Sequence, residues 1–229
     1  MKMSNRNKTS SELIMREDSS GNLEFIGDFE ELYKTEIDPW GQLGNESDKA
    51  SYYACSREHL LKTLEELTSV SVLEVGCGLG VVTEKIFRLP LVKRAVGLDI
   101  SQTAIRKASI QYPDCEFIQG DIRDFSRPSN WQDVDVVVMN QAYWYILDHF
   151  YQALDNMRLL LRDGGHLISV QAFFRDDQQR YGKEIINGFG GLVDIFSQQG
   201  VSGFDLVSAN LTRIKDSQFD DGQILLLKK

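Results

Sequence analysis

The chain has 229 residues, of which 42% are hydrophobic and 26% are charged, close to the average for soluble proteins. At about 100–200 residues per domain, this length allows one domain with a tail or two small domains. Lys and Arg total 25 against 34 Asp and Glu, which gives a formal net charge of -9. Such a charge argues against a protein whose affinity comes from neutralising nucleic-acid phosphates, so no nucleic-acid partner is expected.

The cysteines and the apolar runs indicate a soluble, cytoplasmic protein. Cys55, Cys77 and Cys115 are far apart, odd in number and form no C-x-x-C pair, so neither a disulfide framework nor a zinc site is expected. No apolar run approaches the roughly 18 residues that a membrane span requires. The first residues carry no apolar segment of the secretory type.

Composition divides the chain into a tail and a globular part. Residues 1–22 are rich in Ser, Asn, Lys and Arg, and we expect them to form a disordered tail. Residues 23–229 are expected to form one domain, with a helical segment over 23–68 ahead of a core over 69–229. Within the first segment, helices are predicted around Phe29–Tyr33 and over 49–67.

After residue 68, short apolar strands alternate with amphipathic helices. Strands are predicted at 71–75, 94–99, 115–118, 134–139, 166–174, 204–212 and 223–227, and helices at 81–88, 101–111, 148–162 and 185–198. Ser101 is the expected N-cap of its helix, and Gly164 the expected left-handed cap after Arg162. The pattern predicts an α/β fold, a doubly wound, Rossmann-like seven-stranded sheet that is mostly parallel with an antiparallel C-terminal hairpin.

A glycine-rich turn follows the first strand of this predicted core. Gly76, Gly78 and Gly80 alternate with other residues directly after Glu74-Val75, and their missing Cβ atoms are expected to clear one side of the turn for a ligand. A dinucleotide site requires its third glycine one residue later, where Val81 stands. Ligands of open α/β sheets bind at this carboxyl edge.

G-x-G-x-G preceded by an acidic residue resembles motif I of the class I S-adenosylmethionine-dependent methyltransferases. Asp99 ends the second strand 19 residues after Gly80, and Asp121 follows the third strand. The run L-L-R-D-G-G-H-L-I also resembles an L-K-P-G-G element of that family, with Arg162 and Asp163 in place of Lys and Pro. The resemblance covers roughly residues 30–229.

The resemblance implies S-adenosylmethionine as the cofactor and a role for each matching residue. It implies that Glu74 holds the amine of the cofactor and that Asp99 accepts both ribose hydroxyls. Asp121 would accept from the adenine amine while Ile122 covers the ring. The cofactor-binding residues so implied are Glu74, Gly76, Cys77, Gly78, Gly80, Asp99, Ile100, Asp121, Ile122, Asn140 and Gln141.

The segment before the core carries a second resemblance. D-P-W-G followed by a Tyr-containing helix, Y-Y-A-C-S-R, resembles the start of the nodulation-type N-methyltransferases and related sugar or metabolite enzymes. In that group an N-terminal helical lid covers the cofactor. The resemblance therefore implies cofactor contacts for Trp40, Tyr53 and Arg57, with Arg in place of Lys.

For the methyl acceptor, the best candidate base is His149. It lies off the apolar stripe at the start of the helix after the fourth strand, and a hydroxyl acceptor needs a base of near-neutral pKa. The alternative is a histidine that is simply satisfied at a helix start. Aromatic residues 143–145 either wall an acceptor pocket or fill the core, and residues 175–177 either contact a polar acceptor or form a solvated loop.

Three functions remain in view. The leading one is an S-adenosylmethionine-dependent methyltransferase acting on N or O of a small polar molecule, such as a sugar or amino metabolite. The second acts on a nucleic acid or protein, but the run Asn140–Tyr143 lacks the two prolines of base-methylating enzymes. The third is a cofactor-binding module without catalysis.

Overall fold

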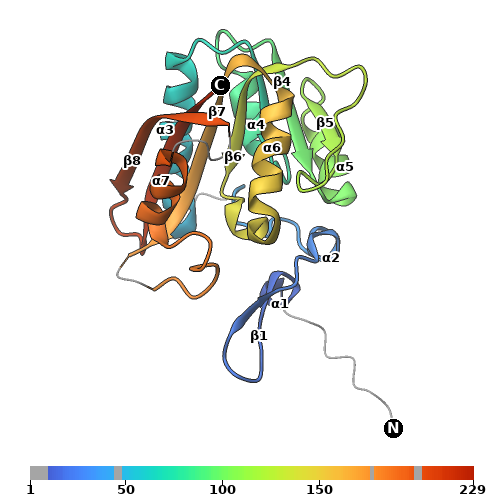
Figure 1. The fold of residues 1–229 in the computed structure, drawn as a ribbon. Coiled ribbons are helices and arrows are strands. Elements are labelled where there is room, and N and C mark those ends of the chain that lie inside the picture. Colours follow the sequence, from blue (N-terminus) through green and yellow to red (C-terminus); the bar gives the residue numbers. More distant parts are fainter. Residues whose placement is uncertain (1–9, 44–47, 176–177, 199–202) are drawn as a thin grey trace.

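A seven-stranded sheet organises the computed structural model, which describes residues 10–43, 48–175, 178–198 and 203–229 (Figure 1). The strand order is β5-β4-β3-β6-β7-β9-β8; the first five run parallel, and β9 is antiparallel to both of its neighbours. Their bounds are β3 Ser71–Val75, β4 Arg94–Asp99, β5 Glu116–Gln119, β6 Val134–Asn140, β7 Leu161–Phe174, β8 Phe204–Arg213 and β9 Phe219–Lys228. The predicted fold class is confirmed.

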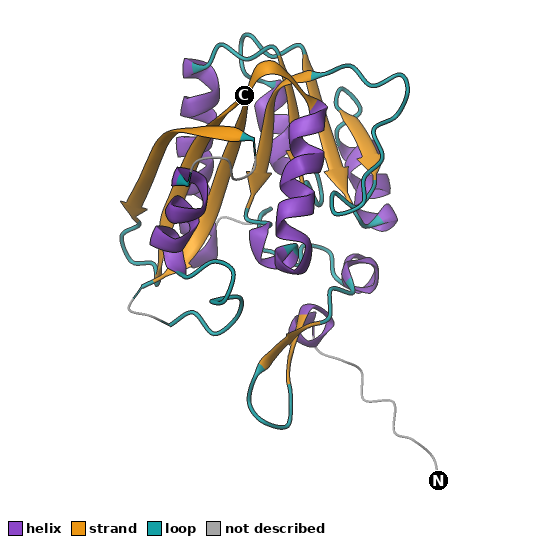
Figure 2. Ribbon diagram, in the orientation of Figure 1, coloured by secondary structure: helices purple, strands orange, loops and turns teal. Residues whose placement is uncertain are grey.

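Helices cover both faces of the sheet (Figure 2). Alternate residues of each buried strand point to opposite faces, so Leu73 packs in one apolar cluster with α6 and α7 while Val72 packs in the other with α3 and α4. The helices of the core are α3 Asp48–Glu66, α4 Val81–Phe87, α5 Gln102–Gln111, α6 Phe150–Leu160 and α7 Gly188–Ser197. In the parts of the chain described, none of the helices has the length and apolar character needed to cross a membrane.

The helix predicted over 148–162 is shorter at both ends. Two 3-10 turns, Tyr143–Tyr145 and Leu147–His149, precede α6. At the other end Leu161 is already extended and pairs with Val134 of β6. Gly164 does adopt φ +66°, but as part of a register shift inside β7 rather than as the helix cap. Leu161 is completely buried, and burying it in the sheet core ends the helix early.

The expectation of a disordered tail is wrong for residues 10–22. Ser10–Ile14 form helix α1, and Met15–Glu17 (β1) pair antiparallel with Leu23–Phe25 (β2). Leu13 and Ile14, the apolar island of the segment, are 5% exposed and form a cluster with Leu32. Burial of these apolar side chains offsets the conformational entropy lost when the segment becomes ordered. The expectation from the polar composition did not take this burial into account. Residues 1–9 lie outside the described residues.

Helix α2 (Phe29–Thr35) is fixed to the N-terminus of α5. The Glu30 carboxylate accepts hydrogen bonds from Thr103 (Oγ1 2.7 Å, N 3.1 Å) and from the Ser101 hydroxyl at 2.7 Å. The Thr103 side-chain bond, followed by the Ser101 bond, lowers the pKa of Glu30 to about 2. Lys107 of α5 donates to the carbonyl oxygen of Tyr33 at 2.6 Å. Helix α2 is therefore anchored at both of its ends, beyond the carboxyl edge of the sheet (Figure 1).

The N-terminal cluster predicts the effect of a matched pair of substitutions. Ile14→Ala removes a buried side chain, and we expect it to destabilise this segment by about 2–5 kcal/mol. Ile37→Ala removes the same atoms from a residue that is 84% exposed. Limited proteolysis should cut the first variant much faster than the wild type within residues 10–36, and the second at the wild-type rate. Equal cleavage of both variants would contradict the packing described.

Candidate functional site

A cavity lies at the carboxyl edge of β3, β4 and β6, between the sheet and the N-terminal segment. It encloses about 1030 Å3 of space that is partly open to solvent. Most of the residues implied by the sequence resemblance line it, namely Trp40, Tyr53, Glu74, Gly76, Cys77, Gly78, Asp99, Ile100, Asp121, Ile122, Asn140 and Gln141. The topology thus brings together residues from six separate stretches of the chain.

The three glycines of the turn have three different neighbours. All have positive φ, +75° at Gly76, +52° at Gly78 and +77° at Gly80. A Cβ at Gly78 would overlap the Tyr33 hydroxyl, and one at Gly80 would lie 2.7 Å from the Phe117 ring. Gly80 is the N-cap of α4 and does not line the cavity. The expectation that all three clear one side is therefore wrong, since Gly80 serves the packing of α4 on the sheet.

Glu74 is a buried acid at the wall of the cavity. Glu74 is only 2% exposed, and its carboxyl group accepts a hydrogen bond from the Thr83 hydroxyl. Burial raises its pKa to about 8, although Thr83 and Asn140 hydrogen bonds act in the opposite direction. A carboxyl group in this position favours a cationic ligand, because an opposite charge lowers the cost of ionising it.

Asp99 ends β4 and faces the same cavity. One carboxylate oxygen accepts from the Gly78 amide at 2.8 Å, and the other accepts from the Ser101 amide at 2.9 Å. Burial raises its pKa to about 6, against the effect of these two donors. The backbone therefore holds the carboxylate in one orientation and leaves lone pairs for hydroxyl groups of a ligand.

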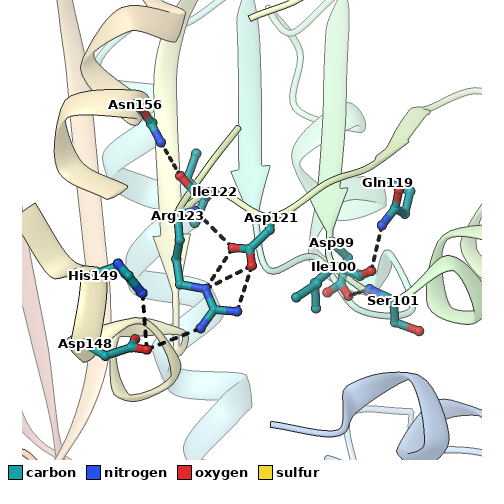
Figure 3. A network of polar contacts seen from close by, with 10 residues as sticks. All are labelled: Asp99, Ile100, Ser101, Gln119, Asp121, Ile122, Arg123, Asp148, His149 and Asn156. Atoms are coloured by element: carbon teal, nitrogen blue, oxygen red, sulfur yellow. Dashed lines mark hydrogen bonds and ion pairs between the residues drawn. The ribbon is translucent and has the colours of Figure 1, made fainter. Parts of the chain in front are cut away.

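Asp121 forms a close ion pair with Arg123, a cavity residue that the sequence reading missed (Figure 3). The guanidinium donates through Nε and Nη2, with a shortest distance of 2.7 Å. Burial raises the pKa of the Asp121 carboxyl, but the hydrogen bonds from Arg123 outweigh it and hold that pKa below its ordinary value. The pair lies two residues apart in a turn, a spacing that gives no periodic signal.

The Gln141 side chain anchors the chain where β6 ends. This residue has φ +58°, an uncommon conformation for a residue with a Cβ. Its Nε2 donates to the hydroxyls of Tyr52 (3.0 Å) and Ser56 (3.2 Å), and its Oε1 accepts from the Ala172 amide at 2.8 Å. The Gln141 amide thereby ties α3, β6 and β7 together at the wall of the cavity.

Aromatic side chains cover the cavity from the N-terminal side. Trp40 donates from Nε1 to the Tyr33 hydroxyl at 2.9 Å, and the rings of Phe29 and Tyr145 meet edge to face at 5.2 Å. All four rings line the cavity. Phe29 and Tyr33 were expected only as the apolar face of a helix, because helical spacing does not distinguish a core residue from a cavity wall.

Besides Gly80, two predicted site residues do not line the cavity. The Arg57 side chain donates to the Tyr53 carbonyl oxygen at 2.9 Å and lines a separate groove beside α3. His149 is 58% exposed in its side chain, with Nε2 3.6 Å from the Asp148 carboxylate. Because a 3-10 turn ends at His149 before α6 begins, Tyr145 and Ile146 reach the cavity in its place.

The remaining acceptor candidates divide between the core and the surface. Tyr143 is 1% exposed and belongs to the core. Trp144 donates to the Ala172 carbonyl oxygen at 3.3 Å, and Arg175 pairs with Asp220 at 2.7 Å. Only Tyr145 of the predicted aromatic wall lines the cavity. Residues 176–177 lie outside the described residues.

Sequence comparisons relate the central part of the chain to methyltransferases. Residues 72–165 match a family described as a methyltransferase domain. Trans-aconitate 2-methyltransferase of Escherichia coli is 27% identical over 146 residues, covering 56% of this chain. The chain spans only about half (55%) of the length of that relative.

Solved structures resemble a larger part of the chain. The N-methyltransferase NodS from Bradyrhizobium japonicum, solved with S-adenosyl-L-homocysteine, has a TM-score of 0.67 at 20% identity and covers 87% of this chain and 97% of its own. Magnesium protoporphyrin IX methyltransferase from Synechocystis has a TM-score of 0.58 at 15% identity, covering 79% and 85%. Both share the fold.

The fold is therefore the Rossmann-like methyltransferase fold, with the cavity at the carboxyl edge where that fold binds its ligand. Residues 72–165 thus resemble a methyltransferase domain, and the solved structures share its fold.

Burial of Glu74 predicts a pH-dependent stability. The folded carboxyl holds its proton up to about pH 8, whereas the unfolded value is 4.5. The folded state thus binds more protons between these pH values, and the free energy of unfolding falls as pH rises through that window. Glu74→Gln removes the pH-dependent contribution of this carboxyl group to the free energy of unfolding. The melting temperature of the variant should exceed that of the ligand-free wild type at pH 9, and the two melting temperatures should converge near pH 5. A difference in melting temperature that does not change with pH would refute the raised pKa of Glu74.

The position of His149 predicts that it is dispensable. Because its side chain is exposed and outside the cavity, His149→Ala should change the turnover of the methyl transfer proposed below by less than about twofold. Steady-state rates across pH 6–9 would check this. A rate loss concentrated below or above one pKa would restore His149 as the base.

Proposed function

We propose that the protein transfers a methyl group from S-adenosylmethionine to a nitrogen or oxygen atom of a small polar molecule, a sugar or amino metabolite. The observation that carries the proposal is the row of carboxyl groups Glu74, Asp99 and Asp121 along one cavity beside the glycine turn. A sulfonium, an amine, two ribose hydroxyls and an adenine amine are all groups that carboxylates recognise.

Each carboxyl group has a separate proposed role in binding. Glu74 takes the amine of the cofactor, and its proton is lost as the cation arrives. Asp99, already oriented by the Gly78 and Ser101 amides, accepts from the ribose. When bound, the cofactor supplies a methyl group on a sulfonium, and the chain contributes mainly by holding donor and acceptor in line at close range.

The aromatic cover is proposed to close the transfer site. The segment 23–68 corresponds to the proposed lid, in which Tyr33 and Trp40 contribute rings to the cavity wall. Its anchoring through Glu30 and Lys107 makes α2 a fixed wall of the cavity. Exclusion of water would strengthen the polar interactions inside.

The charge of the cavity supports an uncharged or basic acceptor. Its lining carries four carboxyl groups, on Asp38, Glu74, Asp99 and Asp121, and one cation, on Arg123. Arg123 is already paired with Asp121. A polycarboxylate such as trans-aconitate would meet uncompensated negative charge, so we propose a sugar hydroxyl or an amine instead. The free cysteines agree with a cytoplasmic location.

The proposal is tested with methyl-labelled S-adenosylmethionine and four groups of acceptors: amines and amino sugars, hydroxylated metabolites, trans-aconitate, and purified tRNA or protein. Label should move to a member of the first two groups. Transfer to trans-aconitate would overturn the acceptor class, and transfer to tRNA or protein would overturn the small-molecule proposal.

Binding of S-adenosyl-L-homocysteine tests the cofactor site separately. Calorimetry should show that Asp99→Ala weakens binding by about 10- to 100-fold, as expected for lost hydrogen bonds to a charged group. Asp114→Ala, a control at a side chain that is 62% exposed, should bind like the wild type. If the wild-type protein does not bind the compound, the proposed function fails entirely.

A further inference from the structure

The turn after β5 holds a carboxylate whose hydrogen-bonding capacity is almost filled by one neighbour. Asp121 Oδ1 accepts from the Arg123 amide and from Nε, each at 3.0 Å, while Oδ2 accepts from Nε at 2.9 Å and Nη2 at 2.7 Å. A carboxylate accepts about four hydrogen bonds in all. Three donor groups of Arg123 therefore leave room for about one further donor.

The turn is also held from outside the pair (Figure 3). The Asn156 side chain of α6 donates to the Ile122 carbonyl oxygen at 2.7 Å. Nη1 of Arg123 lies 3.7 Å from the Asp148 carboxylate, which in turn lies 3.6 Å from His149. These contacts restrain both the backbone of the turn and the far end of the guanidinium, so Asp121 is presented to the cavity in one orientation.

We propose that Arg123 is a positioning residue that makes the cofactor site selective for a base bearing an amino group. It does so by locking the Asp121 carboxylate so that its one remaining acceptor position faces the cavity, where a single N–H donor fits. A base with a carbonyl oxygen in place of the amine would place that oxygen against the free acceptor position of the Asp121 carboxylate, and two acceptors form no hydrogen bond. The inference rests on the proposed function, since it assumes that the adenine end of the cofactor lies beside Asp121.

The planar guanidinium is essential to this role. Two parallel N–H donors fix the rotation of a carboxylate, whereas an ammonium supplies charge without that geometry. Arg123 and Asp121 are each 24% exposed in their side chains, so water competes only partly for the pair. Loss of Arg123 would leave the charge of Asp121 in place but free its orientation.

The test compares the affinities for S-adenosyl-L-homocysteine and S-inosyl-L-homocysteine by calorimetry. The second compound has a carbonyl oxygen in place of the amino group and a hydrogen on the adjacent N1 of the base. The wild type should prefer the first by at least tenfold. In Arg123→Met the preference should fall to about twofold, mainly through weaker binding of the amino compound. Asp121→Asn should lose the preference as well, and Arg123→Lys should fall between Met and the wild type. Arg127→Met, which breaks the surface pair with Asp133, is the matched control.

The outcomes separate the inference from the proposed function. Failure of the wild type to bind S-adenosyl-L-homocysteine would refute both. Normal binding without preference, or a preference unchanged in Arg123→Met, would refute the positioning role and leave the cofactor site standing. Equal weakening of both ligands in Arg123→Met, or full retention in Arg123→Lys, would also overturn it. Melting temperatures near that of Arg127→Met would show that the variants fold.

Discussion

The site depends on keeping carboxyl groups buried at the edge of a hydrophobic sheet. Glu74 is the penultimate residue of β3 and Asp99 is the last residue of the neighbouring β4. Most other residues of these strands are buried, and burial raises the pKa of both carboxyl groups. Ionised groups in such a place are costly unless donors surround them. The local structure supplies those donors, with the Gly78 and Ser101 amides on Asp99 and the Thr83 hydroxyl on Glu74. A ligand that bears a cation and hydroxyl groups would supply the remaining partners of both carboxyl groups.

That requirement accounts for the glycine turn and for the cover above it. Gly78 directs its amide to Asp99 with φ +52°, and its missing Cβ allows the Tyr33 hydroxyl to approach. Tyr33 in turn accepts from Trp40. The same residue therefore satisfies a buried carboxylate and receives the N-terminal cover, so the turn cannot change without affecting the cover. Glu30 likewise connects the N-terminal cover to the core, because its carboxylate accepts a hydrogen bond from the Thr103 amide at the start of α5, just after Asp99.

Much of the core was predictable from the sequence because its signals are local. The bounds of β3 and β4 match the prediction, and Ser101 caps α5 as expected. The features that were missed depend on partners distant in the chain. Leu13 and Ile14 are ordered by a cluster that also includes Tyr145, about 130 residues away. His149 was misplaced because 3-10 turns precede α6, and periodicity does not reveal such turns.

The two walls of the cavity differ in the same way, since one is encoded by local sequence signals and the other depends on residues that are distant in the chain. The wall built from the turns after β3, β4 and β5 is encoded in short motifs, each readable within a few residues, and these motifs carry the carboxyl groups proposed to bind the cofactor. The opposite wall joins Phe29, Tyr33 and Trp40 to Tyr145. Of these four residues only Trp40 belongs to a short motif, D-P-W-G, and no local pattern links the first three to Tyr145. Under the proposed function the acceptor lies against this second wall, so contacts between distant segments would select it. A family resemblance can therefore specify the cofactor while leaving the acceptor to the charge and shape of this wall, where Asp38 adds negative charge and aromatic rings supply the surface.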